Sequence, residues 1–241
     1  MRIAVLSDIH GNLEALNAVA RDLGTCIVDE VICLGDLVGY GPDPEGVVLK
    51  VIQLGYTAIL GNHEAALASK RARDWLNFQA KENNISTEGL LSEDCLNYCC
   101  ELPTSVRRGE AVFVHGAPPD SVTIYLYMMK QQHIEKVLAN SSDKLFFVGH
   151  THQLKLVSLV DGEVIRKKLV PGIQLLDRDR RYFVNCGSVG QPRDGDNRAK
   201  YLIWDSDAWS LEVRAVAYDI ESTAKKIVSR GFPQAYADRL R

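Results

Sequence analysis

Five short apolar runs, each followed at once by a glycine-flanked polar motif, constrain the fold of this chain more than any other feature. Runs of four residues rich in β-branched and aromatic side chains are typical of strands buried on both faces of a parallel sheet. The motifs use five of the six histidines of the chain. The runs span residues 3–6, 31–34, 57–60, 111–114 and 145–148, and the motifs read D-I-H at 8–10, G-D at 35–36, G-N-H-E at 61–64, V-H-G at 114–116 and G-H-T-H at 149–152.

The motifs stand where open α/β sheets hold their ligands, which is beyond the carboxyl ends of the strands. We therefore expect them to converge on one edge of one sheet. Glycine lets the backbone turn sharply there and approach an ion or a phosphate closely. Imidazole nitrogens mixed with hard oxygen donors suit two closely spaced first-row divalent ions. The sequence thus predicts a metal site assembled from strand ends, without cysteine.

The length and composition fit one large domain. With 241 residues, of which 46% are hydrophobic, the chain can bury a sizeable core. We expect a single domain over residues 1–241, with a small helical, cap-like insertion at about residues 64–103 that lies over or beside the site.

The net charge of -3 and the pI of about 6.1 offer no long-range attraction to nucleic acid or anionic lipid, so non-specific nucleic-acid binding is not expected. Residues 1–6 already form the first expected strand, so we expect no secretory signal before it, and no apolar run approaches the length of a membrane span. We expect a cytoplasmic protein without a membrane partner, and a homo-oligomer stays open.

Periodicity predicts the remaining elements. Residues 12–23 indicate a helix with Asn12 as its N-cap and Gly24 at its end, and a second helix is expected at about 44–54. Two or three helices are expected between residues 64 and 103. Beyond His152 the pattern indicates a hairpin over 156–168 with a D-G turn, and strands near 182–185, 200–204 and 211–218. These strands suggest a second, mostly antiparallel or mixed sheet, and residues 220–241 suggest two short helices broken at Gly231 and Pro233.

The sixth histidine and the cysteines carry no chemistry in this prediction. His133 lies in a helical stretch and is expected on its surface. None of the six cysteines forms a C-x-x-C pair, so most are expected to be small core residues. The adjacent Cys99 and Cys100 are the pair open to oxidation.

The order of the motifs from Asp8 to His152 resembles that of the calcineurin-like metallophosphoesterase superfamily. The strings G-Y-G-P-D-P at 39–44 and N-C-G-S-V-G-Q-P-R-D-G at 185–195 resemble its bacterial and archaeal phosphodiesterase branch. A single motif of this kind occurs by chance, but five in the family order do not, and together with the two strings they cover nearly the whole chain. The resemblance implies an α/β fold with a two-layer β-sheet sandwich flanked by helices, and a metal-dependent phosphoric ester hydrolase.

The resemblance also implies two metal ions that share Asp36. The ligands would be Asp8, His10, Asp36 and His152 for one ion, and Asp36, Asn62, His115 and His150 for the other. Two carboxylates and one bridging hydroxide carry three negative charges, and two divalent ions carry four positive charges. One positive charge therefore remains to receive a phosphate. Two ions about 3.5–4 Å apart lower the pKa of a shared water and hold both phosphoryl oxygens during attack. Manganese, iron, cobalt, nickel and zinc all tolerate these ligands, so the metal stays open.

Further residues match the family in roles beyond the metals. His63 matches the catalytic histidine that binds no metal and donates a proton or hydrogen bond to the leaving oxygen. An alternative is that His63 only orients Asn62 or the loop. Tyr40, Asn185 and Arg193 are the candidate substrate contacts, although Asn185 and Arg193 could equally be packing and turn residues.

Departures from the family pattern bear on the substrate. The protein serine/threonine phosphatases of this superfamily extend the second motif with an Asp-Arg pair and place an arginine just before G-N-H-E. This chain has Gly39-Tyr40 and Leu60 at those positions. Fewer fixed cations favour a monoanionic diester over a dianionic monoester, unless Arg193 compensates. The last family string usually has proline after the asparagine, where Cys186 stands, and this concerns the loop geometry rather than the metals.

The sequence therefore predicts a binuclear metal-dependent phosphoesterase that hydrolyses phosphodiesters by attack of a metal-bridging hydroxide. Its substrate would be a small phosphate ester, with nucleotides among the candidates. A phosphomonoesterase, a dinucleoside polyphosphate hydrolase and a non-catalytic scaffold on the same fold are the alternatives. Because every ligand position is filled, the scaffold is the least favoured.

Overall fold

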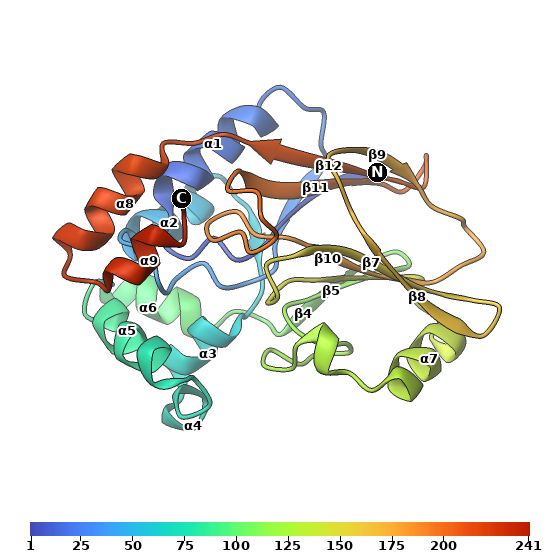
Figure 1. Ribbon diagram of the computed structural model, residues 1–241, viewed down its shortest axis with the longest axis horizontal. Coiled ribbons are helices and arrows are strands. Elements are labelled where there is room, and N and C mark those ends of the chain that lie inside the picture. Colours follow the sequence, from blue (N-terminus) through green and yellow to red (C-terminus); the bar gives the residue numbers. More distant parts are fainter.

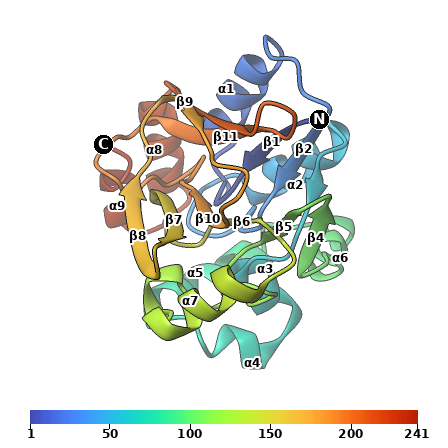
Figure 2. The ribbon, with the colours of Figure 1, turned by 90° about the vertical axis from the view of Figure 1, so that its right-hand side faces the viewer.

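Two mixed β-sheets stack face to face between helices in the computed structural model, which describes residues 1–241 (Figure 1). Figure 2 shows the two sheets nearly edge-on, as two rows of strands one above the other. The expected two-layer α/β architecture is confirmed. None of the helices is both long enough and apolar enough to span a membrane.

The first sheet has six strands and holds three of the five strands predicted to precede the motifs. Its order is β3 (Thr57–Ala58), β2 (Glu30–Cys33), β1 (Arg2–Leu6), β11 (Ala199–Asp205), β12 (Ser210–Val216) and β9 (Gly172–Leu175). Strands β1, β2 and β3 are parallel, whereas β11 pairs antiparallel with β1 and with β12.

The second sheet also has six strands and holds the other two strands that precede motifs. Its order is β4 (Ser105–Arg108), β5 (Ala111–Val114), β6 (Leu145–Val148), β10 (Tyr182–Cys186), β7 (Leu154–Val160) and β8 (Glu163–Lys168). Strands β5, β6 and β10 are parallel, and the predicted hairpin is the antiparallel pair of β7 and β8.

The prediction of one sheet carrying all five motifs is therefore wrong. Strand β11 occupies the edge of β1 at which a further parallel strand could add, so β5 and β6 build their own sheet. The later strands do not form a separate sheet either. Strands β7, β8 and β10 extend the second sheet, and β9, β11 and β12 extend the first.

Three hydrophobic clusters fix these layers. The cluster between the sheets contains Ile3, Val5, Phe113, Phe147 and Trp204, all nearly inaccessible to solvent. A second cluster joins the outer face of the first sheet to the helices near residues 13–53 and 93–100, and a third joins the outer face of the second sheet to the helix after residue 130. Both faces of each sheet are covered, which explains the continuous apolar runs.

The helices follow the prediction with shifts in number and bounds. They are α1 (Leu13–Leu23), α2 (Pro44–Gln53), α3 (Asn62–Ala68), α4 (Lys70–Arg73), α5 (Phe78–Glu88), α6 (Glu93–Cys100), a 3-10 turn η1 (Leu126–Met128), α7 (Gln131–Asn140), α8 (Ile220–Ser229) and α9 (Gln234–Asp238). The side chain of Asn12 caps α1 as predicted, by accepting from the backbone N–H of Ala15 at 3.1 Å.

Three sequence expectations need correction or completion. The region between 64 and 103 contains four helices instead of two or three, and the first of them begins at Asn62. Strands β4 and β9 were not predicted, because both are short edge strands with largely exposed or charged side chains. The strand expected over 57–60 pairs only at Thr57 and Ala58. His133 is exposed on α7, and all six cysteines are free, with Cys99 buried.

Candidate metal centre

The seven predicted metal ligands lie together at the shared end of the two sheets. Asp8 and His10 follow β1, Asp36 follows β2, and the remaining ligands follow β3, β5 and β6: Asn62, His115, His150 and His152. None of the seven side chains is more than 7% exposed. The centre is therefore built between two sheets, at neighbouring strand ends, instead of along one sheet edge.

One half of the centre contains Asp8, His10 and His152. The Nε2 atom of His152 lies 3.1 Å from Oδ1 of Asp8 and 3.2 Å from Nε2 of His10. Three ligand atoms that all lie within 4.8 Å of one another can hold one ion. Oδ1 of Asp8 is buried and accepts no hydrogen bond, so it is an unsatisfied acceptor that faces the two imidazoles.

The other half contains Asn62, His115 and His150. The Nε2 atom of His115 lies 3.0 Å from Oδ1 of Asn62 and 3.2 Å from Nδ1 of His150. The three residues come from the start of α3 and from the ends of β5 and β6, and these atoms lie close together. The mixture of one amide oxygen and two imidazole nitrogens suits a divalent transition metal.

Asp36 joins the two halves. Its Oδ2 atom lies 3.7 Å from Nε2 of His10 and 3.4 Å from Nε2 of His115. Its Oδ1 atom instead accepts the backbone N–H of His63 at 2.9 Å. One carboxylate oxygen therefore faces both halves while the other is held by the start of α3.

Backbone carbonyls orient all four imidazoles. Nδ1 of His10, His115 and His152 lies 3.0, 2.7 and 2.6 Å from the carbonyl oxygens of Val38, Leu34 and Gln191, and Nε2 of His150 lies 3.3 Å from that of Thr123. A ring nitrogen that donates to a carbonyl leaves the other nitrogen unprotonated in the neutral imidazole. In each histidine that second nitrogen is the one directed into the centre.

The backbone around the centre is strained. Of the eight non-glycine residues with positive φ, five lie in the motifs and a sixth, Tyr40, lies in the string at 39–44; the five are Asp8, His10, Asp36, His150 and His152. Each such residue costs about 1–3 kcal/mol and persists only where the surroundings enforce it. The strain is therefore concentrated in the segments that carry the candidate ligands.

The charges of the cluster attract a cation. Burial lowers the pKa of His115, but the carboxylates of Asp36 and Asp8 outweigh it and raise that pKa to about 9. Burial, with the neighbouring His115, lowers the pKa of His150 to about 3. Without a metal, the two buried carboxylates therefore recruit a proton to His115, whereas His150 stays neutral and can act as a ligand.

The comparisons with known proteins agree with this geometry. Residues 1–208 match the model of the calcineurin-like phosphoesterase superfamily domain. The chain belongs to the calcineurin-like phosphoesterase superfamily. Its family and its His/Asp clusters indicate a metal-binding phosphoric ester hydrolase.

Three relatives of this calcineurin-like phosphoesterase cover nearly its whole length. An uncharacterized protein of Methanocaldococcus jannaschii is 36% identical over 99% of this chain and 96% of its own. A metallophosphoesterase from Sphaerobacter thermophilus is 34% identical, with a TM-score of 0.84 over 100% of this chain and 98% of the other. A hypothetical protein from Pyrococcus horikoshii has a TM-score of 0.80 at 18% identity, over 99% and 97% of the two chains, and shares the fold.

His63 of this phosphoesterase lies beside the centre. Its ring is 2% exposed, and the ring centroids of His10 and Tyr40 lie 5.0 and 4.6 Å away in edge-to-face geometry. Its Nδ1 atom is buried and has no hydrogen-bond partner. Burial lowers the pKa of His63, with Asp36 opposing the shift. The side chains of His63, His10 and Asp36 also lie close enough together to hold one ion. The geometry is therefore compatible with His63 as a metal ligand and with His63 as a residue that binds no metal.

Glu64 is a site residue whose role the sequence did not suggest, although it completes the G-N-H-E motif. It is fully buried, and its carboxylate accepts the backbone N–H groups of Asp36, Gly61 and Val38 at 2.8, 3.0 and 3.1 Å. Burial and the charge of Asp36 raise its pKa to about 7. Glu64 thus ties the loop after β2 to the start of α3.

Two asparagines of α5 were also missed. Asn84 donates its Nδ2–H to the carbonyl oxygen of His63 at 3.0 Å, and Oδ1 of Asn83 accepts the backbone N–H of Tyr40 at 2.6 Å. Both side chains are buried. In the sequence, the only signal of this supporting role was a pair of adjacent asparagines on a mostly polar helix. They show that α5 supports the site loops directly.

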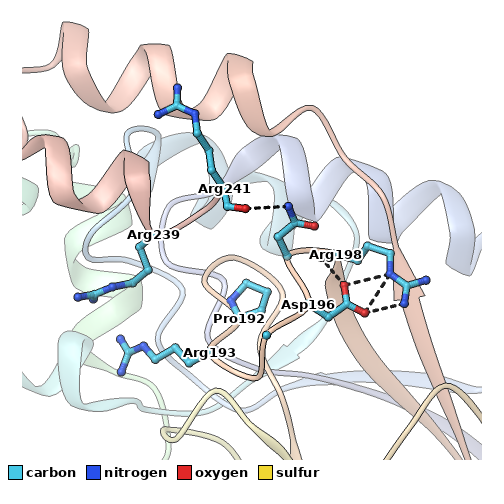
Figure 3. Close-up of a pocket in the computed structure, with 8 residues that line it drawn as sticks. Pro192, Arg193, Asp196, Arg198, Arg239 and Arg241 are labelled. Carbon is cyan, nitrogen blue, oxygen red and sulfur yellow. Dashed lines mark hydrogen bonds and ion pairs between the residues drawn. The ribbon is translucent and has the colours of Figure 1, made fainter.

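Two predicted substrate contacts lie at the open side of the centre. Tyr40 is half-buried against the rings of His10 and His63. The guanidinium of Arg193 lies 5.9 Å from the centroid of the Tyr40 ring and donates to Oε1 of Gln191 at 2.6 Å. In Figure 3, Arg193 and Arg239 point to the same side of an open pocket of about 730 Å³.

Asn185 does not lie on this open side. It is fully buried at the end of β10, where its Nδ2–H donates to the carbonyl oxygen of Gly149 at 2.7 Å and its Oδ1 accepts the backbone N–H of Gly187 at 3.2 Å. Both ends of the amide are occupied by backbone groups. Asn185 therefore holds the G-H-T-H loop, as expected for a packing and turn residue, and its role as a substrate contact stays a prediction.

Proposed function

We propose that this protein is a binuclear metal-dependent phosphodiesterase. One ion would be held by Asp8, His10, Asp36 and His152, and the other by Asp36, Asn62, His115 and His150. The observation that carries the proposal is the position of Asp36 Oδ2 between Nε2 of His10 and Nε2 of His115, at 3.7 and 3.4 Å. A single carboxylate oxygen shared by two sets of buried ligands is what a bridged pair of cations requires.

The donor set fits the proposed ions. The buried Oδ1 of Asp8 has no hydrogen-bond partner, and the imidazole nitrogens directed into the centre lie within about the same distance of one another as ligands of a shared ion. When bound, two divalent ions would supply the positive charge that activates a water and neutralises the phosphoryl oxygens. The protein contributes rigidity, because each imidazole is already held by a carbonyl and need not reorganise.

His63 is proposed as the acid for the leaving group. Its unpartnered Nδ1 and its place between Tyr40 and His10 leave it able to donate a proton to an oxygen that departs from the phosphorus. The hydrogen bond from its backbone N–H to Oδ1 of Asp36 holds the start of α3 beside the candidate metal ligands. This would keep the proton donor at a fixed distance from the reacting phosphate.

The cations around the centre support a diester. Among the residues described here, Arg193 is the one arginine that contacts an aromatic ring of the site, and its guanidinium is already bonded to Gln191. A dianionic monoester is best recognised by several converging guanidinium groups. One such group suits the single charge of a diester.

One observation favours a second candidate, a dinucleoside polyphosphate hydrolase. The pocket in Figure 3 continues from Arg193 to Arg198, Arg239 and Arg241. Arg198 is paired with Asp196, and Arg241 with Glu221, but Arg239 forms no ion pair within the chain. Arg193 and Arg239 could therefore hold the additional phosphates of a longer chain.

The test is a comparison of esters on protein of known metal content. Chelator-treated protein is reloaded with manganese, iron, cobalt, nickel or zinc, and the bound metal is counted by mass spectrometry. We expect two ions per chain, and a higher kcat/KM for bis(p-nitrophenyl) phosphate than for p-nitrophenyl phosphate. A strong preference for the monoester with the same metal would assign a phosphomonoesterase instead, and faster cleavage of diadenosine polyphosphate would select the second candidate.

A further inference from the structure

A second pocket opens beside the metal centre, on the side of α4 and α5. Its volume is about 250 Å³, and Asn62 and His150 of the centre form its inner end. Its walls come from three segments far apart in the sequence: the loop after β2, the connection between α4 and α5, and the loop before η1. The other residues that line it are Tyr40, Ala72, Trp75, Leu76, Asn77, Ala80, Thr123 and Tyr125.

Aromatic rings dominate this pocket. Trp75 is 74% exposed, although a tryptophan without a partner is rarely left in solvent. Across the pocket, the ring of Tyr125 stacks on that of His150 with centroids 3.7 Å apart and planes 16° apart. Tyr127 extends this stack at 5.0 Å from Tyr125. The pocket thus has an exposed indole on one wall and a rigid stack of rings, anchored on a proposed metal ligand, on the other.

The pocket contains no fixed charge. No lysine, arginine, aspartate or glutamate lines it, whereas the pocket at Arg193 contains four arginines. The two pockets therefore differ in what they can bind. The arginine pocket suits anionic groups, and the aromatic pocket suits a neutral, flat one.

Two polar groups in the pocket are free to bond a ligand. Oδ1 of Asn77 caps α5 by accepting the backbone N–H of Ala80 at 2.9 Å, and its Nδ2 has no partner in the chain. The hydroxyl of Thr123 also has no hydrogen bond. A few polar groups on an otherwise apolar wall are typical of pockets that select a planar ligand with polar edges.

We infer that this pocket binds the nucleobase of a nucleoside phosphodiester, stacked on Trp75, while the phosphate lies at the metal centre. The inference rests on the proposed function, since it names the substrate class of the same site. An alkyl or glycerol group would leave the indole without a stacking partner. A nucleobase supplies both a flat ring for Trp75 and polar edges for Asn77 and Thr123.

The kinetic test uses two diesters with the same leaving group. The p-nitrophenyl ester of thymidine 5′-monophosphate carries a base, and methyl p-nitrophenyl phosphate carries none. We expect the metal-loaded wild type to prefer the thymidine ester. Trp75→Ala should lower kcat/KM for that ester roughly 5- to 100-fold, the range expected for one lost base stack, and leave the methyl ester nearly unchanged.

Two variants make the comparison specific. Trp75→Phe keeps a ring and should retain most of the preference. Phe78→Ala removes another exposed aromatic side chain, 78% exposed and three residues further along, that does not line the pocket. It should change neither ester. An equal loss for both esters in Trp75→Ala, no loss for either, or the same loss in Phe78→Ala would overturn the nucleobase assignment.

A binding test separates this inference from the proposed function. Of the three tryptophans, Trp204 and Trp209 are at most 5% exposed, so a bound base can quench only Trp75 strongly. Thymidine 5′-monophosphate should quench the fluorescence, and ribose 5-phosphate should not. Quenching in a metal-loaded protein that hydrolyses neither ester would reject the phosphodiesterase and keep the base pocket. Hydrolysis of both esters at equal rates without quenching would reject the pocket and keep the phosphodiesterase.

Discussion

The carboxylate of Asp36 accepts the backbone N–H of His63 with Oδ1, at 2.9 Å, while its Oδ2 faces the imidazoles of His10 and His115. The residue proposed to bridge the metals therefore also positions the residue proposed to donate the proton. A substitution at Asp36 that keeps an oxygen facing the backbone N–H of His63 would separate the bridging role from the positioning role, because only Oδ2 faces the imidazoles.

Asp36→Asn is such a change. Its amide can keep Oδ1 toward His63 but places an uncharged NH2 between the two halves of the centre. We expect the variant to fold, to bind less metal than wild type, and to lose more than about 100-fold in activity, beyond the effect of losing an outer partner of a ligand. Metal counting and kcat are the measurements. Asp8→Asn, in which only Oδ1 faces candidate ligands and those ligands belong to one half, is the control and should retain more activity.

Removal of metal should abolish turnover. Chelator-treated protein should hydrolyse no ester, and a transition ion should restore the activity, since the proposed nucleophile is a water activated by the metal ions. The rate is measured against the metal content of each sample. Full turnover in protein shown to be free of metal would contradict the proposed mechanism.

His63→Ala should keep both metals and lose rate in a manner that depends on the leaving group. With a poor alkoxide leaving group, the loss of a proton donor should cost about 10²–10⁴ in kcat. With p-nitrophenolate, which departs without a proton, the loss should be much smaller. Equal losses for both substrates at unchanged metal content would show that His63 is not the acid, and a drop in bound metal would make it a ligand.

Glu64→Gln should destabilise the protein and weaken metal binding together. The introduced amide has the size of the carboxylate, yet its NH2 group would face at least one of the three backbone N–H groups whose hydrogen bonds Glu64 now accepts. We expect a loss of about 2–3 kcal/mol in the free energy of unfolding, typical of hydrogen bonds to a charged group. Glu82→Gln, on the exposed side of α5, is the matched control and should be neutral.

The ion pair of Asp22 and Arg214 gives a stability prediction away from the site. Nε and Nη2 of Arg214 donate to Asp22 at 2.7 and 2.8 Å, and the hydroxyl of Tyr201 donates at 2.6 Å. Hydrogen bonding to Arg214 holds the pKa of Asp22 below its ordinary value, against burial. The stabilisation is therefore present above the unfolded pKa of about 3.9 and is lost as the pH falls through the lower folded value.

Asp22→Asn should remove that dependence. Wild type and variant should differ in free energy of unfolding at pH 7, and the difference should shrink as the pH falls below about 4. Denaturant titrations across this range measure it. Asp120→Asn, at an exposed residue without an ion pair, should follow wild type at every pH. A constant difference between Asp22→Asn and wild type down to the lowest pH would show that the carboxylate does not carry the effect.

The clustering of the candidate ligands could be predicted because each motif directly follows a buried run, so strand ends bring Asp8, Asp36 and His115 together whatever the sheet order. The division of strands between two sheets could not be predicted. Strands β2 and β6 both read as buried runs, and a continuous apolar run does not say which neighbour it pairs with.

The roles of the supporting residues could not be predicted from the sequence for a different reason. Asn84, Asn83 and Glu64 act on backbone groups of distant loops, and a hydrogen bond to a backbone leaves no pattern in the sequence of its partner. The positive φ of Asp8 and His10 could not be predicted either, because positive φ stays uncommon even for aspartate and histidine, which adopt it more often than most residues. The position of a strand end can be predicted from neighbouring residues, whereas the geometry of a loop depends on residues far away in the sequence.

The pairing of β1 with β11 has a consequence for the life of the nascent chain. Ile3 pairs with Trp204, so one edge of the first strand stays open until the ribosome has added about 200 more residues, which takes about 10–40 s at ordinary rates of synthesis. An unpaired apolar strand edge is a template for aggregation, and contacts between such distant segments form slowly. The period between translation of the first strand and emergence of the eleventh is thus when this protein most needs a chaperone.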